Sequence, residues 1–218
     1  NYDGKLMEPE VLPAKIPYFL LNGSEGIAVG MTTSTPSHNL TELINLILAY
    51  MKNSAMSLEE MLRIMPGPDF PTGGMVANKD DLAEIYATGQ GKLRLRGKLV
   101  FEKKQGKNDR DKLVITEIPY TMVGAGISKF MQDVAGLCDD KKITDITDIS
   151  NQSGEQGIRI VLELKSNADI EKIENILYKK TKLEDSFPVN MLAIAKGRPE
   201  TLSLKRVLEE YLSFQEER

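Results

Sequence analysis

Few residues of this 218-residue chain have the types and spacing that catalysis needs. Asp109 and Asp111 have the Asp-x-Asp spacing of some magnesium sites, but the many charged residues around them favour a solvated turn. His38 could act as a general base, but no serine or cysteine nucleophile is indicated as its partner. A structural cap at the start of the next helix is the better interpretation of His38, with a phosphate contact as the alternative. Cys138 ends an apolar helix face and fits a core thiol. The sequence therefore indicates no self-contained active site.

A more informative feature is the positive charge gathered between residues 92 and 112. Nine Lys and Arg residues there outnumber three acidic ones, a local net charge of +6 in a chain whose net charge is −4. Lys92, Arg94, Arg96 and Lys98 alternate with apolar residues, which is typical of a half-buried strand with a basic outer face. Such a face could bind the backbone of a nucleic-acid duplex, or its charges could protect the edge of a sheet. Aromatic residues do not alternate with the charges, which argues against stacking on single-stranded bases.

The composition is that of a globular chain, with 41% hydrophobic and 28% charged residues. The single Cys excludes an intramolecular disulfide and the single His excludes two-His metal motifs, so we expect a reducing, cytoplasmic setting and no metal site. The longest apolar stretch, residues 46–51, is far too short to span a membrane. The start at Asn1 lacks a Met and shows no signal peptide, so we expect a segment from inside a longer polypeptide.

The elements that must position these residues mix helices with antiparallel strands. Prolines and glycines in residues 1–38 favour short strands and turns, with one helical turn at 17–21. Hydrophobic periodicity and capping residues predict helices at 39–51, 57–65, 80–88, 127–138 and 169–180 and from Ser203, and strands at 74–77, 158–164 and 189–195. Residues 92–118 are predicted to form one long hairpin. Without a strict βαβ rhythm, the expected class is α+β, with a mixed or antiparallel sheet flanked by helices.

Several separate stretches, all in one order, resemble a single protein family. They are residues 1–4, 8–9, 12–17, 21–31, 36–40, 67–72, 89–92, 117–120, 157–161, 190–192 and 197–199. Among them are Gly26-Ile27-Ala28-Val29-Gly30 and Gly67-Pro68-Asp69-Phe70-Pro71. Together they are similar to the A subunit of bacterial type IIA topoisomerases, DNA gyrase and topoisomerase IV, over essentially all 218 residues.

The resemblance implies part of an ATP-dependent isomerase that passes one DNA duplex through a transient double-strand break in another, an activity used in chromosome segregation. In the family, a Tyr that follows an Arg attacks the DNA. No Tyr of this chain follows an Arg, so the resemblance implies that the nucleophile lies upstream, that no catalytic residue is present and that this segment alone is inactive. Magnesium and ATP are expected on the B subunit, with no cofactor on this chain. The implied partners are duplex DNA, the B subunit, and a second copy of the A subunit in an A2B2 heterotetramer in the cytoplasm, associated with the nucleoid and not with a membrane.

The resemblance also implies a domain organisation. Residues 1–38 are expected to connect from a winged-helix domain and to carry a DNA-bending loop. Residues 39–202 are expected to form the tower, or shoulder, domain. Residues 203–218 are expected to begin a long coiled-coil helix.

Site residues follow from matched positions. Ile27 matches an Ile that wedges between base pairs and bends DNA, with burial under the Gly-rich turn as the alternative. Lys15 and Ser24 match positions near the same DNA. We assign Lys92, Arg94, Arg96 and Lys98 to the outer arms of the duplex because of their charge.

A competing interpretation is that the segment is a structural module that sets subunit geometry with little DNA contact. Departures such as Glu25, where the family has a small or hydroxyl residue, slightly favour topoisomerase IV over gyrase.

Overall fold

The computed structural model describes residues 2–9, 14–106 and 109–217, and the chain divides into two compact units. Unit 1 contains Asn1–Pro68, Ala83–Gln90 and Asn190–Arg218, and unit 2 contains Asp69–Leu82 and Gly91–Val189. Helices combine with antiparallel strand pairs, which confirms the predicted α+β class. Parts of two resembling stretches, at residues 1 and 12–13, lie outside the described residues. No helix within the described ranges is long and apolar enough to cross a bilayer.

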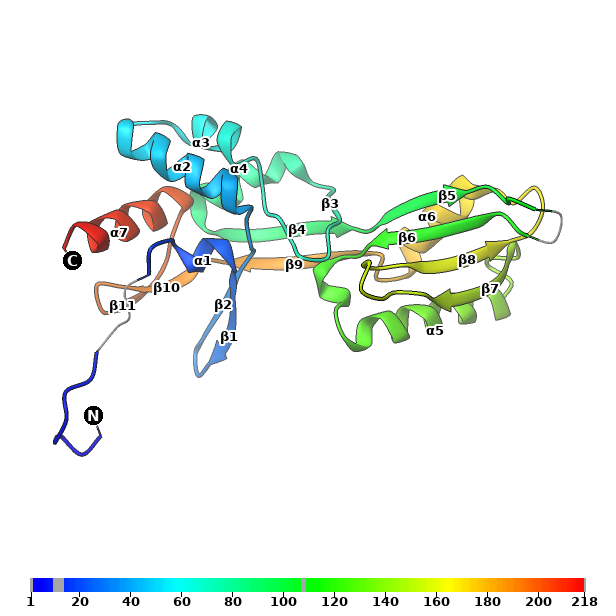
Figure 1. The fold of residues 1–218 in the computed structure, drawn as a ribbon, viewed down its shortest axis with the longest axis horizontal. Coiled ribbons are helices and arrows are strands. Elements are labelled where there is room, and N and C mark those ends of the chain that lie inside the picture. Colours follow the sequence, from blue (N-terminus) through cyan, green and yellow to red (C-terminus); the bar gives the residue numbers. More distant parts are fainter. Residues whose placement is uncertain (1, 10–13, 107–108, 218) are drawn as a thin grey trace. The chain divides into compact units, whose positions relative to one another are not determined.

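Unit 1 combines helices with two β-hairpins (Figure 1). Its helices are α1 (Tyr18–Leu21), α2 (Leu40–Lys52), α3 (Leu58–Ile64), α4 (Leu82–Thr88, which starts at the last residue of a unit 2 segment) and α7 (Leu204–Glu216). One hairpin joins β1 (Ser24–Ala28) to β2 (Met31–Thr35), and the other joins β10 (Leu192–Ala195) to β11 (Arg198–Thr201). The helix starts predicted at residues 39 and 57 are confirmed, since Asn39 caps α2 and Ser57 forms a capping box with Glu60 at α3.

Unit 2 is built on two groups of strands. β4 (Gln90–Arg96) lies between β3 (Met75–Val76) and β9 (Glu184–Asn190). The first residue of β4, Gln90, and the last residue of β9, Asn190, belong to unit 1. The second group is a four-stranded antiparallel sheet in the order β5 (Lys98–Glu102), β6 (Lys112–Glu117), β8 (Ile160–Leu164) and β7 (Ile146–Asn151). The helices are α5 (Ala125–Asp139) and α6 (Ile170–Lys180), with 3₁₀ turns η1 (Lys79–Asp81) and η2 (Tyr120–Met122).

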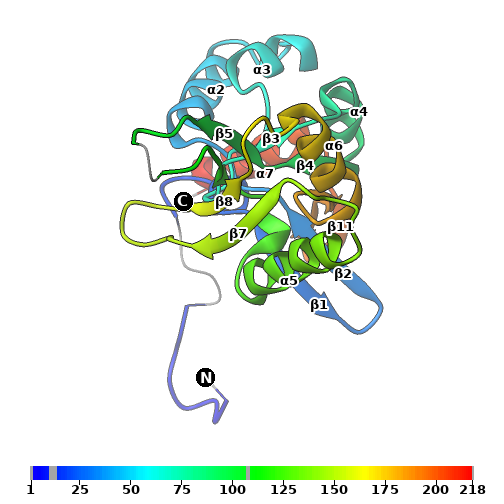
Figure 2. The same cartoon turned by 90° about the vertical axis from the view of Figure 1, so that its right-hand side faces the viewer.

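The core of unit 2 lies on one face of its four-stranded sheet. Figures 1 and 2 show α5 and α6 on the same side of the sheet. Alternate residues of β6 and β8 point to these helices, with Leu113 paired to Leu162 and Ile115 paired to Ile160, and all four are buried. These four residues therefore build the apolar face on which the helices pack, and Val114 and Val161 between them are buried as well.

The predicted single hairpin over 92–118 is wrong, because the chain leaves one strand group and enters the other at Gly97. The Gly97 N–H donates to the Leu183 carbonyl at 2.8 Å, and a Cβ on Gly97 would lie 2.6 Å from Leu183 Cδ1. Only β5 and β6 pair as the strands of a hairpin, from Lys98 opposite Glu117 to Glu102 opposite Lys112. Residues 107–108 of the predicted hairpin lie outside the described residues. The strand predicted at 189–195 is likewise interrupted at Met191, whose N–H donates to the Gly89 carbonyl at 2.8 Å.

The C-terminal helix begins where it was expected. Ser203 caps α7 by accepting a hydrogen bond from the Arg206 N–H. Its apolar stripe, Leu204, Val207 and Leu208, is buried. Continuation of α7 into a coiled coil stays a prediction, as do the boundaries at residues 38 and 203.

Candidate nucleic-acid interface

The β1–β2 hairpin of unit 1 ends in an exposed apolar tip (Figure 1). Its strands are joined by the two-residue turn Val29-Gly30, in which Gly30 adopts the left-handed φ of 81°. Ile27 is 91% exposed and Val29 is 102% exposed. The alternative that Ile27 is a core residue is therefore wrong. Its side chain is available to contact another molecule.

An apolar groove continues from this tip onto the neighbouring β10 strand. The groove has a volume of about 280 Å³. It is lined by residues 26–28 and 31–33 of the hairpin and by Leu192, Ala193 and Ile194 of β10. Ile194 is itself exposed. The exposed apolar surface at the hairpin thus extends beyond Ile27.

Asn190 braces the hairpin at the middle of β2. Its side-chain N–H donates to the Thr32 carbonyl at 2.7 Å, and its backbone carbonyl accepts from the Thr33 hydroxyl at 3.4 Å. Its side-chain oxygen accepts from Gln90 and Thr201, each at 3.3 Å. We did not predict this role from the sequence. The only signal was that Asn190 lies in one of the resembling stretches.

The other matched positions, Lys15 and Ser24, also lie in unit 1. Ser24 is half-buried and opens β1 opposite Thr35. Lys15 is exposed, and its carbonyl accepts a hydrogen bond from the Tyr211 hydroxyl at 2.6 Å. Gln215 donates to the neighbouring Ala14 carbonyl at 2.7 Å, so α7 holds the backbone that carries Lys15.

The predicted basic strand is divided between β4, which carries Lys92, Arg94 and Arg96, and β5, which carries Lys98, and most of its charges are occupied by intramolecular contacts. Arg96 donates from Nε to Glu184 at 2.7 Å and lies 4.4 Å from the centre of the Tyr178 ring. Arg94 approaches the same carboxylate at 3.7 Å, and Lys98 pairs with Glu117 at 3.3 Å. Lys92 is exposed, and no acidic group of the described residues lies within 4 Å of its ammonium. Lys92 is therefore the member of this strand best able to meet a phosphate.

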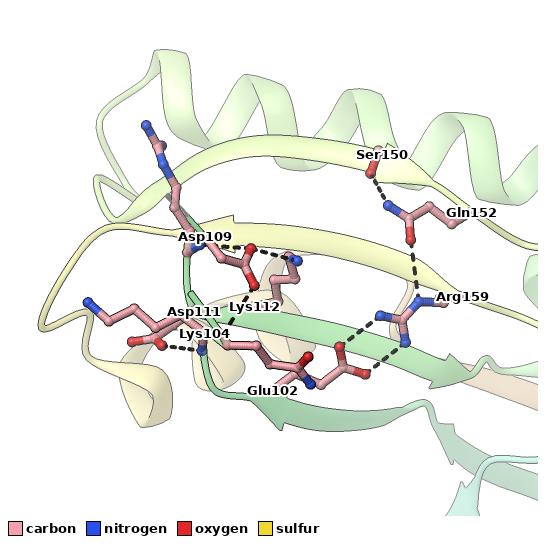
Figure 3. A network of polar contacts seen from close by, with 10 residues as sticks. Glu102, Lys104, Asp109, Asp111, Lys112, Ser150, Gln152 and Arg159 are labelled. Atoms are coloured by element: carbon pink, nitrogen blue, oxygen red, sulfur yellow. Dashed lines mark hydrogen bonds and ion pairs between the residues drawn. The ribbon is translucent and has the colours of Figure 1, made fainter. Parts of the chain in front are cut away.

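A second polar cluster lies around the strands of the four-stranded sheet (Figure 3). Arg159 donates two hydrogen bonds of 2.7 Å to Glu102 and a third, of 3.3 Å, to Gln152. Because the charge-assisted bonds to Arg159 favour the ionised form, the pKa of the Glu102 carboxyl lies below its ordinary value. The cluster therefore ties β5 to β8 through ionised groups.

Asp109 and Asp111, the Asp-x-Asp pair, close the turn between β5 and β6. Asp109 pairs with Lys112 at 2.9 Å, which lowers the pKa of its carboxyl, and Asp111 accepts from the Lys104 N–H at 2.9 Å (Figure 3). Within the described ranges, no group of three or more His, Cys, Asp or Glu side chains is arranged to hold a metal ion.

The Glu102–Arg159 pair should give stability a pH dependence of defined sign. A carboxyl whose folded-state pKa is lowered stabilises the fold above its unfolded-state pKa, about 4.3 for Glu, and loses that effect as the pH falls through the folded-state value. We expect Glu102→Gln to lower the free energy of unfolding modestly at pH 7, because the pair is partly exposed, and to cost less at pH 3. Urea unfolding at both pH values measures this. An equal cost at both would contradict the assignment.

The comparisons with known proteins agree with the resemblance. The family described as the A subunit of DNA gyrase/topoisomerase IV matches residues 1–218. The DNA gyrase A subunit of Buchnera aphidicola is 46% identical over 217 residues, that of Clostridium acetobutylicum 43% over 217, and that of Synechocystis 42% over 216. These alignments cover 98–100% of this chain but only 25–26% of each relative, so the chain spans about a quarter of their length.

The three relatives are gyrase subunits and lend no support to the slight preference for topoisomerase IV. A family match along the whole chain, with several relatives above 40% identity, is decisive for its membership. The chain belongs to the family of DNA gyrase and topoisomerase IV A subunits.

Proposed function

We propose that this chain is a DNA-binding and DNA-bending part of the breakage–reunion core of an ATP-dependent type II topoisomerase. The observation that carries the proposal is the apolar tip of the β1–β2 hairpin, where Ile27 is exposed on β1 while Asn190 braces the paired strand β2. An apolar side chain fully presented to solvent is well suited to enter between two base pairs.

DNA bending by this hairpin involves no covalent step. Inserting Ile27 unstacks one base step at a cost of a few kcal/mol, which is offset when the bent duplex contacts more protein surface. The β-branched side chain of Ile27 is stiff at χ1, so it keeps its orientation when it contacts the base pairs. Small neighbours, Gly26 and Ala28, allow the backbone to approach a groove closely.

The remaining parts of the reaction are assigned to other segments and subunits. The tyrosine nucleophile belongs to the same polypeptide outside these residues, and the magnesium and ATP sites belong to the B subunit. The working assembly is an A2B2 heterotetramer on duplex DNA in the cytoplasm. This segment alone then neither cleaves nor relaxes DNA.

A bending measurement on the full-length protein with its B subunit tests the proposal. A duplex labelled with a donor and an acceptor at its two ends should show increased energy transfer on binding, because bending brings the ends together. Wild-type protein that binds the duplex at saturation and leaves it straight would refute the proposal.

One observation favours a structural role for part of the basic strand. Arg96 is bound by Glu184 and stacked on Tyr178, so its charge is already satisfied within the protein. A structural role within the protein is therefore favoured for Arg96, whereas Lys92 is the residue that we assign to DNA binding.

This difference predicts two distinct responses to salt. Removing one phosphate-binding cation should reduce the slope of log K against log salt by about 0.9. We expect Lys92→Gln to reduce the slope by about that amount in the full-length protein, and Arg96→Gln to leave it unchanged while lowering the melting temperature. Titrations of a labelled duplex at several salt concentrations measure both. Equal slopes for wild type and Lys92→Gln would mean that Lys92 only protects a sheet edge.

A further inference from the structure

The single histidine of the chain lies at the base of the β1–β2 hairpin and is 3% exposed. His38 Nδ1 lies 2.7 Å from the Leu20 carbonyl oxygen, and Nε2 lies 2.7 Å from the Tyr86 hydroxyl. Because a carbonyl oxygen can only accept, Nδ1 donates to Leu20, and Nε2 of the tautomer with its proton on Nδ1 can accept from the Tyr86 hydroxyl. The expected capping of α2 is instead supplied by the Asn39 side chain.

Tyr86 is suited to this donor role. It lies on α4 and is 1% exposed, and its ring centre is 5.7 Å from that of His38. Burial, with a smaller effect from the charge of Glu42, raises the pKa of Tyr86 well above its ordinary value. The hydroxyl is therefore protonated at neutral pH and can donate a hydrogen bond.

His38 also joins the two legs of the hairpin. Its backbone N–H donates to the Leu21 carbonyl at 3.2 Å, next to the Leu20 carbonyl that its ring contacts. Leu20 and Leu21 precede β1, whereas His38 follows β2, so both ends of the hairpin meet at this residue. The bond to Tyr86 then ties that junction to α4.

We propose that the His38–Tyr86 pair is a positioning device that sets the direction of the DNA-bending hairpin. The proposal rests on the proposed function of Ile27 and adds the residues that aim it. Ile27 lies three residues beyond Ser24, about 10 Å along the strand, so a tilt of about 10° at the base moves the tip by about 2 Å. Displacements of that size are large for a side chain that must enter between two base pairs.

Amide hydrogen exchange in the full-length protein tests the hold of this pair on the hairpin. Tyr86→Phe removes one oxygen atom and keeps the packing of the ring. Tyr50→Phe is a matched control, because Tyr50 is also buried in unit 1 and its hydroxyl donates to Glu209 at 3.2 Å, within a contact between α2 and α7. We expect exchange in peptides covering residues 22–36 to rise roughly five- to thirtyfold in Tyr86→Phe and to stay unchanged in Tyr50→Phe.

A double-mutant cycle shows whether the hydrogen bond itself carries the effect. Asparagine at position 38 can still donate to the Leu20 carbonyl but does not reach Tyr86, so His38→Asn should resemble Tyr86→Phe. The double variant should exchange no faster than either single variant, because both remove the same bond. Energy transfer in a saturated, end-labelled duplex should fall severalfold in all three variants and stay normal in Tyr50→Phe.

Two results would overturn the proposal. One is equal hairpin exchange in Tyr86→Phe and Tyr50→Phe, and the other is full additivity in the double variant. Failure of the proposed function has a different signature. In that case wild-type protein leaves the duplex straight, while the exchange measurement, made without DNA, still decides whether the pair holds the hairpin.

Discussion

Replacing Ile27 by alanine should reduce DNA bending and strand cleavage by the full-length enzyme roughly tenfold to a hundredfold, a change of about 1.4–2.8 kcal/mol. The methyl of alanine does not reach between two base pairs, so the bent complex loses the side chain that holds one step open. The melting temperature should stay nearly constant, because Ile27 is 91% exposed and leaves no cavity when shortened. A buried aliphatic side chain, by contrast, costs about 2–5 kcal/mol on truncation to alanine.

Val29→Ala is the matched control for Ile27→Ala. Val29 is also β-branched and fully exposed, and it lies two residues away in the turn of the same hairpin. We expect Val29→Ala to change bending much less, because the wedge requires one side chain at one position. Equal losses in the two variants would mean that the tip acts as a general apolar surface. A large drop in melting temperature for Ile27→Ala with normal bending would refute the wedge.

The helix starts could be predicted from the sequence because capping is a local interaction. Asn39, Ser57, Asp169 and Ser203 each accept a hydrogen bond from a backbone N–H two or three residues further on, so a short window contains the whole signal. The short apolar runs of Leu113–Ile115 and Ile160–Leu162 similarly indicated strands, and all six residues are buried. These elements depend on few distant residues.

Features set by distant contacts could not be predicted in the same way. The break at Gly97 depends on Leu183, and the ion pair of Arg96 depends on Glu184, a separation of 88 residues. Nothing near Arg96 in the sequence indicates that its charge is already satisfied. The periodicity correctly predicted a strand with Lys92 and Arg94 exposed, but it could not show that this strand ends before Lys98 or which of the cations remain available.

The same distinction between local signals and distant contacts applies to the candidate site. An Ile within a glycine-rich stretch is as compatible with burial as with exposure, so local sequence left both open, and the resemblance alone suggested the wedge. The exposure of Ile27 depends on the hairpin that carries it, and the hairpin depends on His38, Tyr86 and Asn190. Residues that position a site through tertiary hydrogen bonds have no spacing of their own.

Gly23→Ala should have the largest effect on stability of any single methyl added to this hairpin. Gly23 adopts the left-handed φ of 71°, and a Cβ there would lie 2.3 Å from the Thr35 carbonyl oxygen and 3.0 Å from the Ser37 nitrogen. Both are backbone atoms, so the clash can be relieved only if the two legs of the hairpin separate. The left-handed backbone and the overpacking together should lower the free energy of unfolding by about 2–5 kcal/mol.

Gly30→Ala separates the steric clash from the backbone effect. Gly30 has a similar φ of 81°, but no heavy atom of the described residues lies within 4 Å of the place that a Cβ would take in the open turn. Only the left-handed backbone cost of about 1–2 kcal/mol therefore applies. The free energy of unfolding, measured with urea, should be lower for Gly23→Ala than for Gly30→Ala by more than the uncertainty of the method. Gly23→Ala should also lose duplex bending, because it opens the junction at which His38 meets Leu21, while Gly30→Ala should keep most of it. Equal costs in the two variants would show that the base of the hairpin yields to the added methyl, and that its closure does not hold Ile27 in place.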